Sequence, residues 1–534
     1  MTRKHAFIPL ALVILACSAP GRHSSSSRSS IVVGTAVDMT GVNQLVGSHT
    51  RFSQDVIDLL FLRLFLEQPD FADHPPTFLP QLVKDHSWSD DNLSLRIELR
   101  DDVLWSDGVP LTAEDVAWTF KAQTDPDVAW GYSHSKRAVN RVEARGPQTV
   151  VFHFTSVYPS RLADINEGVV LPKHAWGRLP FDRWRGNADW FRRHLVVNGP
   201  YDLATWEPHH EIVLERNPRY FRRQRPKLDH VVFRVIPHSA HRFRQLLSGE
   251  IDFVEQIRAA DQGRLEASNN ARPISYWHRQ YTHIVWNACQ EPFSDPRVRL
   301  ALTLGIDRHH LVESLFGNAA RIGITPVPQS VWAFDTEILP WPHSPARARR
   351  LLADAGWVDS DDDGVLDKQG RPLSFELSTN SDNQVRLDAA MMIQSQLAEI
   401  GVDTRVLGLE FNTLVDRNIE HDFDATIGAW GIDTTLDLRY AFHSSSRDSG
   451  YNYGCFSDPE VDRLIGEIRR QPTFELARPL LHDLQRIIHE QQPYTFLWEP
   501  RRTDGAAIRL RGLAPNLLSA YYNLEEWWVE SEGI

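Results

Sequence analysis

LSLRIELRDDVLWSDGVPLTAEDVAWTF, residues Leu93 to Phe120, contains the signals of a strand, a turn and a helix in direct succession. Apolar and polar residues alternate from Leu93 to Leu99, which is the period of a half-buried strand. Asp107-Gly108 predicts a turn, and Thr112 predicts a helix N-cap followed by two acidic residues in the positively polarised first turn. Every residue here has a structural explanation, so the stretch indicates a fold and requires no catalytic chemistry.

Strand and helix signals also alternate along the rest of the chain. Ile31 to Thr35 predicts a strand, and residues Gln54 to Leu66 are apolar at helical spacing. No repeat of helical or propeller length is present. The chain is therefore expected to form α/β lobes.

Length and composition limit the function classes. At 534 residues the chain has room for two or three domains. The net charge of -13 argues against a nucleic-acid partner, which would favour a basic face. Seventeen Trp residues are unusually many, and Trp both fills large cores and lines pockets that accept varied ligands.

The N-terminus predicts export. A basic start precedes the apolar run Ala6 to Ala16, which is too short to span a bilayer and ends at Cys17. Residues 1–17 resemble a bacterial lipoprotein signal in which Cys17 is acylated; an ordinary secretory signal with an incidental Cys is the alternative. Residues 18–30 are Ser-rich and predict a flexible tether. We expect an extracytoplasmic body held at a membrane by its lipid anchor only.

The two remaining cysteines, Cys289 and Cys455, have two interpretations. An even pair in an exported protein allows a disulfide, and two buried free thiols are the alternative.

The stretch Gly428-Ala-Trp-Gly-Ile-Asp433 is the main candidate for ligand contact. It predicts the end of a buried strand, Phe423 to Ile427, leading into a turn opened by glycine, where the backbone can come close to another group. Trp430 offers a flat apolar face and one donor, and Asp433 is a single carboxylate. This combination suits a ligand with a cationic amine and an extended backbone. The alternative is a strand-to-loop junction with a core Trp and a solvated Asp.

Several long motifs together resemble the family 5 extracellular solute-binding proteins, the oligopeptide- and dipeptide-binding subunits of ABC importers. They cover nearly the whole chain after the tether: Leu99–Phe120, Asn198–Pro208, Ile212–Tyr220, Pro292–Arg308, Ala346–Trp357, Met392–Val402 and Tyr453–Leu464. The resemblance implies a periplasmic-binding-protein-like α/β fold of three domains in two lobes, with a ligand cleft that closes about a two-strand hinge. Lobe 1 would comprise residues 31–284 and 496–534, with an inserted domain within about 62–190, and lobe 2 residues 285–495. The hinge is expected near Tyr281–Asn287 and Pro493–Trp498.

The resemblance also implies a function without catalysis or cofactor. It implies that a monomer captures a peptide or other small solute and delivers it to permease subunits driven by separate ATPases. Asp433 would bind the α-amino group of the peptide, with Trp430, Ala429 and Gly431 beside it. Asn287 and Tyr453 stand at motifs near the cleft, where the alternative is strand bonding and packing. Arg386 could pair with a ligand carboxylate, although an Arg early in a helix is more often solvated.

The acidic run Asp359 to Asp367 resembles the start of a calcium loop. Asp359, Asp361, Asp363 and Asp367 fall at ligand positions one, three, five and nine, but the twelfth position is Gly370 instead of Glu. We therefore favour a surface hairpin turn over a metal site.

Other functions remain open alternatives. The same scaffold can bind a sugar, an opine or a metal chelate, and a sensory lipoprotein could present a closed lobe pair to a receptor. A hydrolase has no support, because the chain contains no Gly-x-Ser-x-Gly or His-Glu-x-x-His motif.

Overall fold

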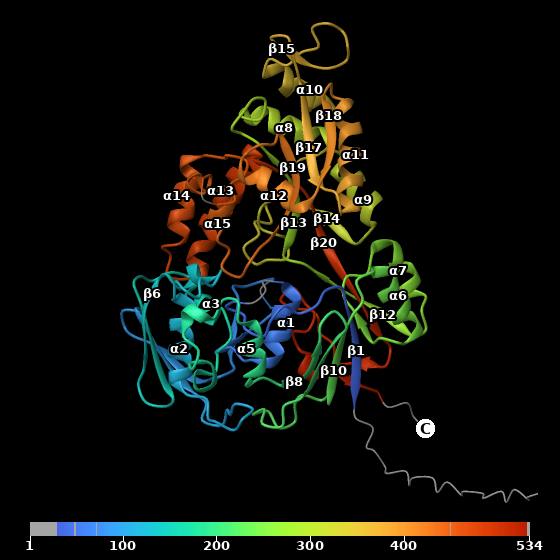
Figure 1. Cartoon of the computed structure of the whole chain (residues 1–534). Helices are drawn as coiled ribbons and strands as arrows, with labels where there is room; N and C mark the ends of the chain where they lie inside the picture. Colours follow the sequence, from blue (N-terminus) through green and yellow to red (C-terminus); the bar gives the residue numbers. More distant parts are fainter. Residues whose placement is uncertain (1–28, 47–49, 71, 449, 531–534) are drawn as a thin grey trace, which may run out of the picture.

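Two lobes stacked one above the other form the protein (Figure 1). This computed structural model describes residues 29–46, 50–70, 72–448 and 450–530. The signal segment, Cys17 and almost all of the tether lie outside these residues. The lower lobe in Figure 1 holds the N-terminal half of the chain and the C-terminal segment, and the upper lobe holds most of the residues between them.

A twelve-stranded sheet runs through both lobes in the order β18-β17-β19-β13-β20-β11-β1-β10-β9-β8, with β12 and β14 also paired to β20. Its strands are β1 (Ser30–Thr35), β8 (Tyr201–Glu207), β9 (Glu211–Arg216), β10 (His230–Val235), β11 (Phe253–Val254), β12 (Ala271–Trp277), β13 (Gln280–Trp286), β14 (Ala320–Ile322), β17 (Ser374–Asn380), β18 (Asp403–Leu409), β19 (Ala425–Gly431) and β20 (Tyr494–Ala507).

Strand β20 connects the lobes. Its first half pairs with β13 in the upper lobe, with Thr282 opposite Trp498, and its second half pairs with β12 in the lower lobe, with Trp277 opposite Arg501. The chain therefore passes between the lobes at about residues 278–281 and 499–500. The segments expected to form the hinge lie on β13 and β20, immediately on the upper-lobe side of this crossing.

The opening motif folds as its sequence predicts. Strand β5 (Ser94–Leu99) buries Leu95, Ile97 and Leu99 within a second sheet, ordered β4-β5-β7-β6. Helix α2 (Ala113–Thr124) begins after Thr112, whose backbone N–H donates to the Asp115 carboxylate at 2.9 Å. The other strands of this sheet are β4 (Val83–Trp88), β6 (Val139–Ala144) and β7 (Thr149–Phe154).

The two lobes have separate hydrophobic cores. One large cluster joins the lower-lobe part of the main sheet to the second sheet, so the inserted region shares its core. Two clusters fill the upper lobe between Tyr281 and Trp498. The domain boundaries at 284/285 and 495/496 stay predictions.

Helices flank the sheets in both lobes. Those of the lower lobe are α1 (Arg51–Leu60), α2, α3 (Arg161–Asn166), α4 (Lys173–Trp176), α5 (Ala188–Arg193), α6 (Ser239–Ser248) and α7 (Ala259–Glu266). Those of the upper lobe are α8 (Pro296–Gly305), α9 (Arg308–Phe316), α10 (Pro345–Asp354), α11 (Gln384–Ala398), α12 (Phe411–Ile419), α13 (Arg439–Phe442), α14 (Pro459–Ile468) and α15 (Phe474–Gln491). Within the described ranges, none of the helices is long and apolar enough to cross a bilayer.

Two local predictions were wrong. The helix expected up to Leu66 ends at Leu60, and Phe65–Glu67 forms strand β2, which pairs with β3 (Phe78–Pro80). The strand expected to end at Ile427 continues as β19 to Gly431, because β13 pairs with it up to Gln280 opposite Gly431. Gly428 and Gly431 therefore lie in a strand, and a Cβ on either would meet only ordinary contacts, at 3.6 and 3.9 Å.

Candidate ligand-binding site

A large cavity lies between the lobes. Its volume is about 1410 Å³, above the roughly 300–1,000 Å³ of pockets for drug-sized ligands. The lower lobe contributes α1, β2, α3 and residues 130–138, and the upper lobe contributes residues 433–440, 450–451 and part of α14. A ligand in this cavity can contact both lobes at once.

Asp433 lies in the cavity wall, two residues after β19 ends. Its Oδ1 accepts hydrogen bonds from the Thr435 N–H at 3.0 Å, the Thr435 hydroxyl at 2.7 Å and the Leu436 N–H at 3.1 Å. These bonds fix the carboxylate while its side chain remains exposed to the cleft. Desolvation by the surrounding walls raises the pKa of Asp433, against the opposing effects of the Thr435 hydrogen bond and the charge of Arg279. A cation from a ligand would stabilise the ionised form.

Three residues form an interlobe latch beside Asp433: Glu67, Arg279 and Thr434. The Thr434 hydroxyl, from the upper lobe, donates to Glu67 Oε1 of the lower lobe at 2.5 Å. Arg279, at the crossing between the lobes, donates from Nη1 to Thr434 Oγ1 at 3.0 Å, and the same nitrogen lies 4.0 Å from Glu67 Oε1. No motif in the sequence pointed to any of these three residues.

Aromatic rings form the wall next to Asp433. The ring of Trp430 packs against Tyr440, Tyr451 and Tyr453 at centroid distances of 5.2, 5.6 and 6.0 Å. Tyr440 and Tyr451 line the cavity, and Trp430 supports them from behind. This wall offers ring faces to an apolar or cationic group of a ligand.

The remaining predicted contacts lie outside the set of described residues that line the cavity. Asn287 is 1% exposed and donates from Nδ2 to the carbonyls of Phe423 and His421 at 2.7 and 3.0 Å. Arg386 donates to Asn380 Oδ1 at 2.8 Å. Tyr453 is 8% exposed, and Ala429 and Gly431 pair with β13 as part of β19.

Cys289 and Cys455 form a disulfide, with a Cα–Cα distance of 5.3 Å. It links the segment after β13 to the loop that carries Tyr451 into the cavity. The structure therefore confirms the disulfide and not the pair of free thiols.

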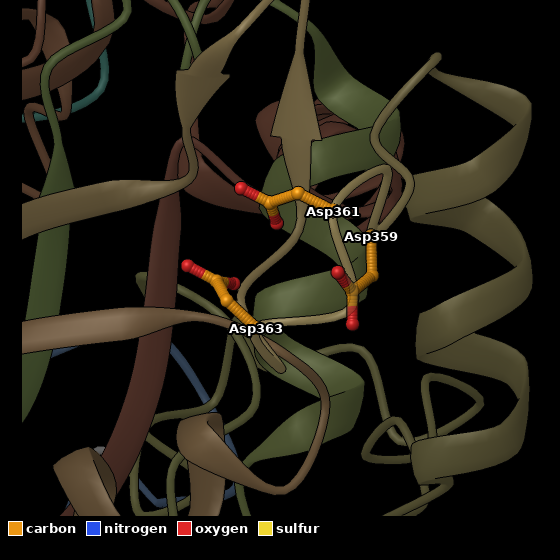
Figure 2. Close-up of side chains that lie close together, drawn as sticks. All are labelled: Asp359, Asp361 and Asp363. Atoms are coloured by element: carbon orange, nitrogen blue, oxygen red, sulfur yellow. The ribbon is translucent and has the colours of Figure 1, made fainter.

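The acidic run forms an exposed loop, none of whose residues lines the cavity, and Figure 2 shows three of its aspartates. Carboxylate oxygens of Asp359, Asp361 and Asp363 lie within 4.8 Å of one another. Asp359 accepts from the Gly364 N–H at 3.1 Å, and Asp367 accepts from the Ser360 N–H at 2.9 Å, outside that group of three. The antiparallel pairing of Val358 with Asp367 closes the loop as a hairpin, and the expectation that it binds no metal stays a prediction.

Comparison with known proteins identifies close counterparts of this architecture. The model of the bacterial extracellular solute-binding proteins, family 5 Middle, matches residues 77–452. The oligopeptide-binding protein AppA of Bacillus subtilis is 29% identical over 97% of both chains, and a di/tripeptide-binding protein of Pseudomonas aeruginosa is 26% identical over 84% of this chain and 86% of its own. The structure of Bacillus subtilis AppA in complex with a nonapeptide matches with a TM-score of 0.77, covering 94% of this chain and 99% of that one.

Proposed function

Because the chain belongs to the family 5 bacterial extracellular solute-binding proteins, we propose that it captures peptides in the cavity between its lobes. The observation that carries this proposal is the exposed carboxylate of Asp433 inside a cavity walled by both lobes. A ligand that contacts both walls favours the closed arrangement by its additional affinity for that state.

In this proposal the amino-terminal ammonium group of the peptide pairs with Asp433. Its Oδ1 already accepts three hydrogen bonds from residues 435 and 436, so Oδ2 is the oxygen that receives the ligand. Tyr440 and Tyr451 then lie beside the first residues of the peptide. The volume leaves room for side chains and adaptable water, which suits a binder of varied peptides.

The closed protein would deliver its peptide to the permease subunits of an ABC importer, whose ATPases are separate chains. It would act as a monomer without catalysis, tethered outside the cytoplasm by a lipid on Cys17. The apolar run that ends at Cys17 and the Ser-rich tether support this placement. Mass spectrometry of the N-terminal fragment from a membrane fraction tests it, because an acylated Cys17 carries the added mass of its lipid.

The test of the ligand class is direct. The protein is purified from cells, washed and denatured, and the small molecules that it releases are identified by mass spectrometry. A mixture of short peptides, reduced in Asp433→Asn, supports the proposal. Release of a single sugar, opine or metal chelate would show that the cleft binds that ligand instead of a peptide.

A further inference from the structure

In the group formed by the latch and the neighbouring Asp433, carboxylates outnumber cations. Asp433 from the upper lobe and Glu67 from the lower lobe approach the same region, and Arg279 lies beside both. The side chains of Glu67 and Arg279 are only 23% and 13% exposed, so water screens them poorly. Two carboxylates face one guanidinium here. The other charges that act on these three groups are two cations, Arg51 and Arg63, and two carboxylates, Glu167 and Asp437, so the group stays one positive charge short of neutrality. A cation from the ligand would supply that charge.

The lower lobe holds Glu67 in place independently of the upper lobe. Glu67 ends β2, which pairs with β3. The Tyr522 hydroxyl donates to the Glu67 carbonyl at 2.8 Å, and Gln68 Nε2 donates to the same hydroxyl at 3.1 Å. These contacts fix the main chain of Glu67, and closure of the lobes brings its carboxylate to Thr434, the residue next to Asp433.

We propose that Glu67 is a specificity-determining residue. When the lobes close, its carboxylate joins that of Asp433 in binding the amine of the ligand. The protein thereby selects ligands with a free, cationic amino terminus over ligands of the same size whose terminus is neutral. This inference rests on the proposed function, because it assumes that the ligand amine lies at Asp433.

If Glu67 only held the lobes together, its substitution would affect all ligands alike. If its charge binds the ligand amine, substitution would affect free-amine ligands most. Glu67→Gln separates the two, because the amide oxygen still accepts the Thr434 hydroxyl while the negative charge is lost. Thr434→Val is the matched control, since it removes the latch hydroxyl and keeps both carboxylates. Glu525→Gln is a second control, because Glu525 is another carboxylate of the lower lobe that lines the cavity.

The experiment uses the chain from Ser29 onward, which contains every described helix and strand. It is incubated with an equimolar mixture of two peptide libraries with randomised side chains, one with free and one with N-acetylated amino termini. The retained peptides are quantified by mass spectrometry. We expect the wild type to retain the free-amine peptides in at least about tenfold excess, the size of effect that a hydrogen bond to a charged group gives.

Glu67→Gln should reduce that excess severalfold, whereas Thr434→Val should lower total retention and leave the excess unchanged. Glu525→Gln should also leave the excess unchanged. An unchanged excess in Glu67→Gln, with peptides still bound by the wild type, would overturn this inference alone. A wild type that retains no peptide of either kind would overturn it together with the proposed function.

Discussion

Replacing Asp433 by asparagine removes one negative charge from the cleft and leaves the local turn intact. The asparagine Oδ1 can accept the same hydrogen bonds from Thr435 and Leu436 that the carboxylate accepts now. The substitution changes only the other atom of the group, from an anionic oxygen to an amide NH₂. The folded structure should therefore remain, and the effect should fall on a cationic ligand.

The magnitude follows from the interaction that is lost. A hydrogen bond to a charged group contributes about 1.5–3 kcal/mol, so Asp433→Asn should weaken binding of a free-amine peptide roughly 10- to 150-fold. Isothermal titration calorimetry with a peptide identified from the purified protein measures this change. The N-acetylated form of that peptide should lose far less affinity on the same substitution.

Asp437→Asn is the matched control. Asp437 lines the same cavity four residues later, and its carboxylate lies 3.9 Å from Arg469. Its loss should change the affinity for the free-amine peptide by less than about threefold, as expected of an exposed ion pair. Equal effects of the two substitutions, or no effect of Asp433→Asn, would refute the assignment of the amine site.

Three further predictions concern pH, the disulfide and calcium. Affinity for a free-amine peptide should fall as pH drops from neutral to about 4, because protonated Asp433 cannot pair with an ammonium group. The fall should start at a higher pH than for an ordinary aspartate with a pKa of about 3.9, because desolvation raises the pKa of Asp433. Calorimetry across pH checks this, and Asp433→Asn should flatten the profile. Replacing Cys289 and Cys455 by alanine should lower the free energy of unfolding by about 2–5 kcal/mol in urea titrations, because the bond links residues 166 positions apart; an unchanged midpoint would contradict this. Calcium should leave the unfolding temperature of the protein unchanged, because the loop at Asp359 lacks the Glu ligand at its twelfth position; a rise that disappears in Asp361→Asn would reverse the hairpin interpretation.

Local signals in the sequence predicted the elements that local interactions determine. Strand β5 follows from the alternation of apolar residues, and the start of α2 follows from Thr112 and Asp115, which are three residues apart. The end of β19 was misplaced because the strand is extended by pairing with β13, about 150 residues earlier in the chain. A pattern of glycines could not reveal that pairing.

The site was predictable only in part for the same reason. Asp433 stood out as a lone carboxylate after a buried strand and matched the family resemblance. Glu67 and Thr434 meet across 367 residues, and Glu67 belongs to a short strand with no polar motif of its own. Arg279 directly precedes β13, where the hinge was expected, and its position was the one signal that could have drawn attention to it.

The central claim is that a peptide binds between the lobes and draws them together. Small-angle X-ray scattering of the protein, first stripped of ligand by unfolding and refolding and then saturated with its peptide, measures this most directly. We expect the peptide to decrease the radius of gyration of the wild type. Asp433→Asn should show no such contraction at a peptide concentration that saturates only the wild type. Tight peptide binding without any contraction would contradict it.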